Sequence, residues 1–181
     1  MLTNSETLKC KTAKDTFERN YRISSFNMAP IIDRMVYAGG AFASILLDEK
    51  PRDVDVFILN TQKSDYDIFQ KYVDVNSYTI DKKNNDSSAS AYKGTNPHIH
   101  SVWKVVRNSI DYDLIFTDYQ TPEEMISDFD YVHSNVWFYS GRLYLTESTY
   151  RSIIDMKLIP ASEKPIAPKR KQKFIDRGWK E

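Results

Sequence analysis

Residues 36–57 read VYAGGAFASILLDEKPRDVDVF, and this stretch decides the fold that we expect. A short apolar run ends in two adjacent glycines, an apolar segment follows, and a turn with a proline leads into alternating Asp and Val. Strict alternation of polar and apolar residues is typical of a strand with one buried face. We therefore predict strands at 35–38 and 53–59, joined by a helix over 41–47 and a turn.

The glycines and the aspartates have separate physical meanings. Gly39 and Gly40 have no Cβ, so their backbone can take φ > 0 and let a phosphate approach closely. A helix that begins near Ala41 would point its free N–H groups at that phosphate. Asp53 and Asp55 lie two residues apart on a strand, so both point to the same face and repel each other. Because Mg²⁺ takes carboxylate and phosphate oxygens as ligands, the pattern predicts a magnesium site beside a phosphate-binding turn.

Residues 39–57 resemble the head motif of the DNA polymerase β-like nucleotidyltransferase superfamily, in the form found in CCA-adding enzymes and poly(A) polymerases. Two later segments, PEEMISDFDYVHSNVWFY at 122–139 and KFIDRGWK at 173–180, resemble small, mostly bacteriophage-encoded proteins with the same head. The chain departs from the CCA-adding pattern at 43–44, where that pattern has Arg-Asp and this chain has Ala-Ser.

The resemblance implies which residues bind what. Gly39 and Gly40 would hold a nucleoside triphosphate, and Asp53 and Asp55 would bind the metal ions. Apart from the resemblance, Ser44 on the predicted helix could add a hydroxyl to the phosphate site, although a serine on a helix is more often structural.

Two-metal phosphoryl transfer needs ligands for two ions about 3.5–4 Å apart, and two carboxylates are few for that task. The superfamily usually adds an acid from a neighbouring strand. The run IDYDLIF at 110–116 offers Asp111 and Asp113 on one face. We prefer Asp113 as catalytic and metal-binding residue, because the apolar residues after it anchor a central strand. Asp111 is the reserve, and two solvent-facing acids without a metal are the alternative.

The rest of the chain predicts an α/β (α+β) protein with a mixed, largely antiparallel sheet and flanking helices. Two pairs of apolar runs form hairpins, at 101–117 and 132–146, with turns at Asn108-Ser109 and Ser140-Gly141. Thr121 followed by Pro-Glu-Glu marks a helix start. Further helices are expected at 11–21, 64–75 and 147–156, and a polar loop at 81–97.

Composition limits the classes of function. The chain has 181 residues, typical of one domain, and its formal net charge of +0 excludes a protein that binds nucleic acid through a global basic field. A single cysteine excludes an intramolecular disulfide. No apolar run has the length of a membrane span, and residues 1–15 lack the apolar core of a secretory signal. We expect a single nucleotidyltransferase-like domain over 1–181 in the cytoplasm, a host's cytoplasm if a phage encodes it.

The end of the chain, about 160–181, is basic, with KRKQK at 169–173. Phe174 and Trp179 are interleaved with these cations, so the segment is a candidate RNA-binding tail in which rings stack on unpaired bases. Two alternatives are a solvated tail and a tail whose two rings dock on the core.

The function expected from these residues is Mg²⁺-dependent transfer of a nucleoside monophosphate from a nucleoside triphosphate, ATP among them, to a hydroxyl, with RNA or tRNA as a candidate acceptor. Two Mg²⁺ ions are expected. The alternative is a catalytically inactive relative that binds nucleotide or nucleic acid as a phage accessory protein.

Overall fold

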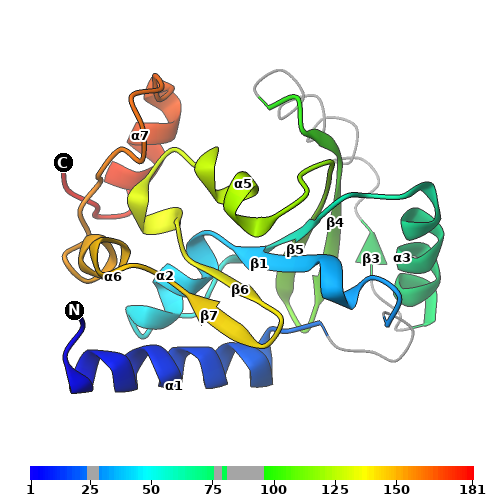
Figure 1. The fold of residues 1–181 in the computed structure, drawn as a ribbon, viewed down its shortest axis with the longest axis horizontal. Helices are drawn as coiled ribbons and strands as arrows, with labels where there is room; N and C mark the ends of the chain where they lie inside the picture. The colour runs from blue at the N-terminus through cyan, green and yellow to red at the C-terminus, as the bar shows by residue number, and fades with distance from the viewer. Residues whose placement is uncertain (24–28, 76–78, 81–95) are drawn as a thin grey trace.

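A seven-stranded mixed sheet lies at the centre of the fold, in the order β3-β4-β5-β2-β1-β6-β7 (Figure 1). The structure is a computed structural model that describes residues 1–23, 29–75, 79–80 and 96–181. The strands are β1 (Met35–Ala38), β2 (Asp53–Ile58), β3 (Thr79–Ile80), β4 (Ile99–Arg107), β5 (Ile110–Thr117), β6 (Trp137–Tyr139) and β7 (Arg142–Tyr144). Strands β2 and β5 pair in parallel, and the other neighbouring strands are antiparallel. The predicted mixed, largely antiparallel α+β fold is confirmed.

Helices flank this sheet. They are α1 (Asn4–Asn20), α2 (Gly40–Leu46), α3 (Lys63–Val75), α5 (Pro122–Ser127), α6 (Glu147–Ile154) and α7 (Pro168–Ile175), with short 3-10 turns η2 (Ile32–Arg34) and η3 (Val132–Ser134). Helix α1 starts earlier than predicted, because Thr3 and Glu6 form a capping box at its first turn. Thr121 caps α5 as predicted. No helix within the described part of the chain combines the length and apolar character that a membrane crossing needs.

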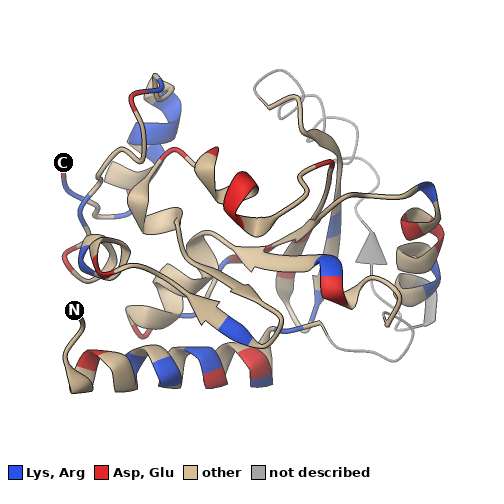
Figure 2. Ribbon diagram, in the orientation of Figure 1, with Lys and Arg blue, Asp and Glu red and all other residues tan. Residues whose placement is uncertain are grey.

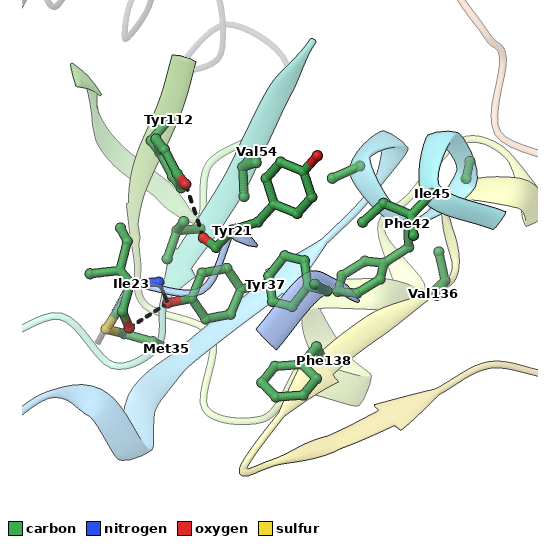
Figure 3. Packing of buried hydrophobic residues seen from close by; sticks show 14 of the residues in the cluster. Tyr21, Ile23, Met35, Tyr37, Phe42, Ile45, Val54, Tyr112, Val136 and Phe138 are labelled. Carbon is green, nitrogen blue, oxygen red and sulfur yellow. Dashed lines mark hydrogen bonds between the residues drawn. The ribbon is translucent and has the colours of Figure 1, made fainter. Parts of the chain in front are cut away.

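Two apolar clusters cover the two faces of the sheet. The larger cluster includes Val54 and Val56 of β2 together with Phe17 of α1 and Phe42 of α2. Figure 3 shows part of it, with the buried Tyr37 hydroxyl bonded to the backbone of Ile23. The smaller cluster lies on the opposite face. There, Phe57 of β2 and Ile115 of β5 join Met125 and Ile126 of α5.

Both predicted hairpin turns have the backbone that their residues favour. Asn108 and Ser109 have φ of 52° and 59°, and Ser140 and Gly141 have φ of 47° and 77°. Positive φ at both central positions is characteristic of the type I′ turn, whose twist matches that of the two paired strands. The second hairpin is shorter than predicted, because 132–134 form η3 rather than a strand. Most of the predicted loop at 81–97 falls beyond the described residues.

Candidate functional site

The turn between β1 and α2 carries one strained glycine. Gly39 has φ of 82° and ψ of −147°, a backbone region that residues other than glycine avoid. A Cβ on Gly39 would lie 3.0 Å from Oδ2 of Asp55, so the glycine also makes room for that carboxylate. Gly40 differs from our expectation of φ > 0, because it is the first residue of α2 and a Cβ on it would meet nothing within 4 Å.

Carboxylates from two adjacent strands lie side by side at this turn. Asp53 and Asp55 alternate along β2, and the parallel register places Asp111 opposite Asp53 and Asp113 opposite Asp55. Asp113 is 7% exposed and Asp55 is partly buried, whereas Asp111 is exposed. Of the two acids on β5, Asp113 is therefore the buried one and the one that lies opposite Asp55.

The electrostatics of Asp55 are those of a crowded anion. Burial, followed by the negative charges of Asp53 and Asp113, raises the pKa of Asp55 to about 7 from an ordinary value of 3.8. Like charges at close range and a shortage of water both disfavour the ionised form. A positive charge bound at this point would stabilise the ionised carboxylate.

Lys104 of β4 already provides one positive charge, and our sequence analysis did not identify it. Lys104 lies opposite Asp113 in the β4–β5 register, and its Nζ donates to both carboxylate oxygens, at 2.7 and 3.1 Å. Burial alone would lower the pKa of Lys104, but the hydrogen bond and the charge of Asp113 raise it. The sequence signal was the β4–β5 hairpin, since its two-residue turn fixes which residue faces Asp113.

One row across the sheet thus contains Ala38, Asp55, Asp113 and Lys104, from strands β1, β2, β5 and β4. Metal ligation by these acids stays a prediction. Within the described ranges, no three His, Cys, Asp or Glu side chains gather as a ready metal-binding group. Ser44 lies on α2, one helical turn after Gly40, and is partly buried. Its part in phosphate binding also stays a prediction.

The basic C-terminal segment docks on the fold. Phe174 of α7 and Trp179 are 7% and 8% exposed, and their rings lie 4.7 and 4.0 Å from the ring of buried His133. Of our alternatives for the tail, docking on the core is therefore the one observed, and these two rings are not exposed for stacking on bases. Arg170 Nε lies 2.6 Å from Asp130 Oδ2, which ties α7 to the segment after α5.

Two cavities lie away from the carboxylates. One of about 320 Å³ is lined by α1 and the end of α2, including Lys9 and Asp48. One of about 220 Å³ is lined by residues that include Tyr37 and Phe138. Neither lining includes Gly39 or the aspartates of β2 and β5, so both cavities are separate from the candidate site.

Solved structures with a similar fold are enzymes that act on tRNA. A tRNA-processing enzyme in an apo form aligns with a TM-score of 0.50 and 10% identity over 90% of this chain and 38% of that chain. A tRNA nucleotidyltransferase complexed with a primer tRNA and an ATP analog gives 0.47 and 12%, over 68% and 34%. The Bacillus stearothermophilus CCA-adding enzyme with CTP gives 0.45 and 16%, over 86% and 38%. This chain spans little more than a third of their length, and at these identities the likeness concerns the fold.

The sequence comparisons lead to a narrower assignment. No curated protein matches this sequence significantly. The sequence model of the Gabija anti-defense 2 (Gad2) family matches residues 10–155, which include α2, the β2 and β5 carboxylates and Lys104. The match covers most of the chain, and the chain therefore belongs to the Gabija anti-defense 2 family.

Proposed function

We propose that the protein is a Mg²⁺-dependent nucleotidyltransferase, which moves a nucleoside monophosphate from a nucleoside triphosphate to a hydroxyl acceptor. The observation that carries the proposal is the contact between the turn and the carboxylates. Gly39 leaves room for Asp55, which shares β2 with Asp53 and lies opposite Asp113 of β5. A turn without side chains next to clustered carboxylates brings phosphate and cation together.

The chemistry of the side chains fits a magnesium ion at Asp53 and Asp55. Both provide the hard oxygen ligands that Mg²⁺ prefers, and the burial and neighbouring negative charges that raise the pKa of Asp55 make a bound cation favourable there. Asp113 would join as a ligand by exchanging its ion pair with Lys104. When bound, Mg²⁺ neutralises charge on the phosphates and lowers the pKa of an acceptor hydroxyl.

The chain itself positions the reactants. The acceptor oxygen attacks the α-phosphorus, the bond from that phosphorus to the bridging oxygen breaks, and pyrophosphate leaves. Gly39 admits the phosphates to the face of β2 that carries Asp55. Asp55, with a pKa of about 7 before a cation arrives, exchanges protons with solvent at neutral pH, and the proton of the acceptor hydroxyl passes to water. Positioning and neutralisation of charge are the main contributions of a protein to this type of reaction.

Release of pyrophosphate tests this proposal. The protein is incubated with Mg²⁺ and each of the four labelled nucleoside triphosphates, with RNA or tRNA as acceptor. Release should depend on Mg²⁺ and be lost when Asp53→Asn and Asp55→Asn are combined. A matched control combines Asp67→Asn with Asp155→Asn, two exposed acids on α3 and after α6, and should keep the activity. Equal release by both double variants would contradict the assignment of the site.

A second candidate function is binding without turnover. The ion pair of Lys104 with Asp113 favours it, because a lysine that neutralises the third carboxylate takes the place of a metal. In that case nucleotide or nucleic acid binds, but no pyrophosphate is released. Lys104→Gln discriminates further. If Lys104 competes with Mg²⁺ for the carboxylate of Asp113, this variant should bind Mg²⁺ more tightly than the parent protein does.

The biological setting follows from the family name. We infer that nucleotide chemistry at this site serves to counter the Gabija defence, in the cytoplasm of the host cell. Infection of cells that carry Gabija tests this step. We expect the phage to replicate in cells that express the parent protein and to be blocked in cells that express the Asp53→Asn, Asp55→Asn variant. Phage replication with both proteins would show that the anti-defence role does not need this site.

A further inference from the structure

Lys104 is the cation that the sheet itself brings to the carboxylates. It lies opposite Asp113 in the pairing of β4 with β5, strands that run side by side in Figure 1, and Asp113 lies opposite Asp55 in the pairing of β5 with β2. Alternation along β4 puts Lys104 on the same face as Val102, which packs in the smaller apolar cluster with Phe57 of β2. The ammonium group and the aspartates therefore share one face of the sheet.

The contact between Lys104 and Asp113 is close, but its two partners differ in freedom. Nζ of Lys104 donates to both carboxylate oxygens, at 2.7 and 3.1 Å. The side chain of Asp113 is 10% exposed, whereas that of Lys104 is 34% exposed and has a flexible aliphatic stem. When this pair opens, the ammonium group therefore moves and the carboxylate stays in place.

A Mg²⁺ ion bound at Asp113 would open this pair. An ammonium group and a divalent cation repel each other on one carboxylate, so the ion that takes the oxygens of Asp113 displaces Nζ of Lys104. Neighbouring ligand oxygens on an octahedral Mg²⁺ ion lie about 3 Å apart. A phosphate oxygen on the same ion would thus be about as far from the carboxylate as Nζ is now. The displaced ammonium group is then close to phosphate oxygens, with which it can form charge-assisted hydrogen bonds.

We propose that Lys104 exchanges Asp113 for the triphosphate. In the free protein it neutralises the third carboxylate, and in the loaded protein its Nζ binds a non-bridging oxygen of the phosphates. The inference rests on the proposed function and adds a phosphate-binding residue to its site. It differs from the second candidate function, in which Lys104 only takes the place of a metal. In that case, removal of the lysine would favour every ligand of the site.

Lys104→Gln tests the exchange, because two titrations should respond in opposite directions. Calorimetry measures binding of Mg²⁺ alone, and binding of inorganic tripolyphosphate at saturating Mg²⁺. The variant should bind Mg²⁺ more tightly than the parent protein does. It should bind tripolyphosphate more weakly, by roughly tenfold, as expected for the loss of one charge-assisted hydrogen bond. Lys164→Gln is the matched control, since Lys164 pairs with Asp128 at the same distance of 2.7 Å, and it should match the parent in both titrations.

A second pair of variants keeps the test valid if Lys104→Gln folds poorly. Asp113→Asn is compared with the double variant Lys104→Gln, Asp113→Asn, which removes both members of the ion pair and leaves neither charge without its partner. In this background the gain in Mg²⁺ affinity should shrink, because the carboxylate for which the two cations compete is gone. The roughly tenfold loss for tripolyphosphate should remain. Melting temperatures of all variants show that the compared proteins are folded.

The outcomes separate this inference from the proposed function. If the parent protein releases pyrophosphate and Lys104→Gln binds tripolyphosphate as tightly as the parent does, or more tightly, the inference is wrong and the function stands. If the two affinities change in opposite directions but the parent releases no pyrophosphate, the inference stands and the transfer activity does not. Weaker binding of both ligands by Lys104→Gln, or an equal loss of tripolyphosphate in Lys164→Gln, would show a structural or general charge effect and overturn the inference.

Discussion

Gly39 meets two demands at one position. Its backbone lies in a region where other residues are strained, and a Cβ there would press on Oδ2 of Asp55 at 3.0 Å. The neighbouring Gly40 meets neither demand. The two glycines, which look equivalent in the sequence, therefore have different roles, and substitution separates them.

Gly39→Ala should lower the free energy of unfolding by roughly 1–3 kcal/mol, the usual cost of a side chain in this backbone region. Gly40→Ala should be neutral, or stabilising by up to about 1 kcal/mol, because alanine favours a helix over glycine. Chemical denaturation of both variants measures the difference. Similar stabilities for the two variants would show that the strain at Gly39 has no energetic consequence.

The pKa of Asp55 predicts how stability depends on pH. Between about pH 4 and pH 7 the folded protein keeps a proton on Asp55 that the unfolded chain has lost. The contribution of this group to the free energy of unfolding should therefore fall as pH rises through that range, by at most about 1.4 kcal/mol per pH unit. Denaturation of the parent protein and of Asp55→Asn over this range isolates the effect, since only the parent should show it. Saturating Mg²⁺ should reduce it, and a constant difference between the two proteins would contradict it.

At the scale of elements, local patterns predicted most of the core and missed the end of the chain. Strand β1 was predicted at its observed bounds, and Asn108-Ser109 is the expected turn. Helix α7 was not predicted, and three prolines, Pro160, Pro165 and Pro168, come at or just before its start. Pro168 instead occupies the first turn of the helix, where proline loses no hydrogen bond. The helix then depends on contacts with His133, which no local pattern contains.

His133 links the docking of α7 to pH. Its ring is 1% exposed, and neither ring nitrogen has a hydrogen-bond partner among the described residues. Burial lowers its pKa to about 4 from 6.5, while Asp130 opposes this shift and Arg170 adds to it. The contribution of His133 to stability should be complete above pH 6.5 and be lost as pH falls towards about 4.

His133→Phe should remove this acid sensitivity while it keeps the aromatic packing with Phe174 and Trp179. Denaturation of both proteins between about pH 4 and pH 6.5 measures the effect as a difference. Parallel pH profiles for parent and variant would mean that the buried ring does not titrate with unfolding.

At the scale of the whole molecule, the site is assembled from β1, β2, β4 and β5. The alternation of Asp53 and Asp55 was readable from the sequence, because one strand determines it. The pairing of Asp55 with Asp113 was only a preference, because strand register across a parallel pair is a tertiary property. Lys104 was missed although the turn of the β4–β5 hairpin fixes its place opposite Asp113, whereas the docking of α7 depends on contacts between separate elements.

The net charge of +0 conceals this arrangement. Four aspartates lie on β2 and β5, and basic residues gather on α7, as Figure 2 shows for that helix. Binding of RNA by the basic segment stays a prediction. Because Phe174 and Trp179 are buried, only the cations of the segment would contact the RNA.

The most direct test of the central claim is calorimetric titration of the protein with each nucleoside triphosphate, with and without Mg²⁺. We predict saturable binding of one triphosphate per chain that requires Mg²⁺, is lost in the Asp53→Asn, Asp55→Asn variant, and persists in the Asp67→Asn, Asp155→Asn control. Absence of binding for all four nucleotides, or equal binding by the two variants, would contradict the account.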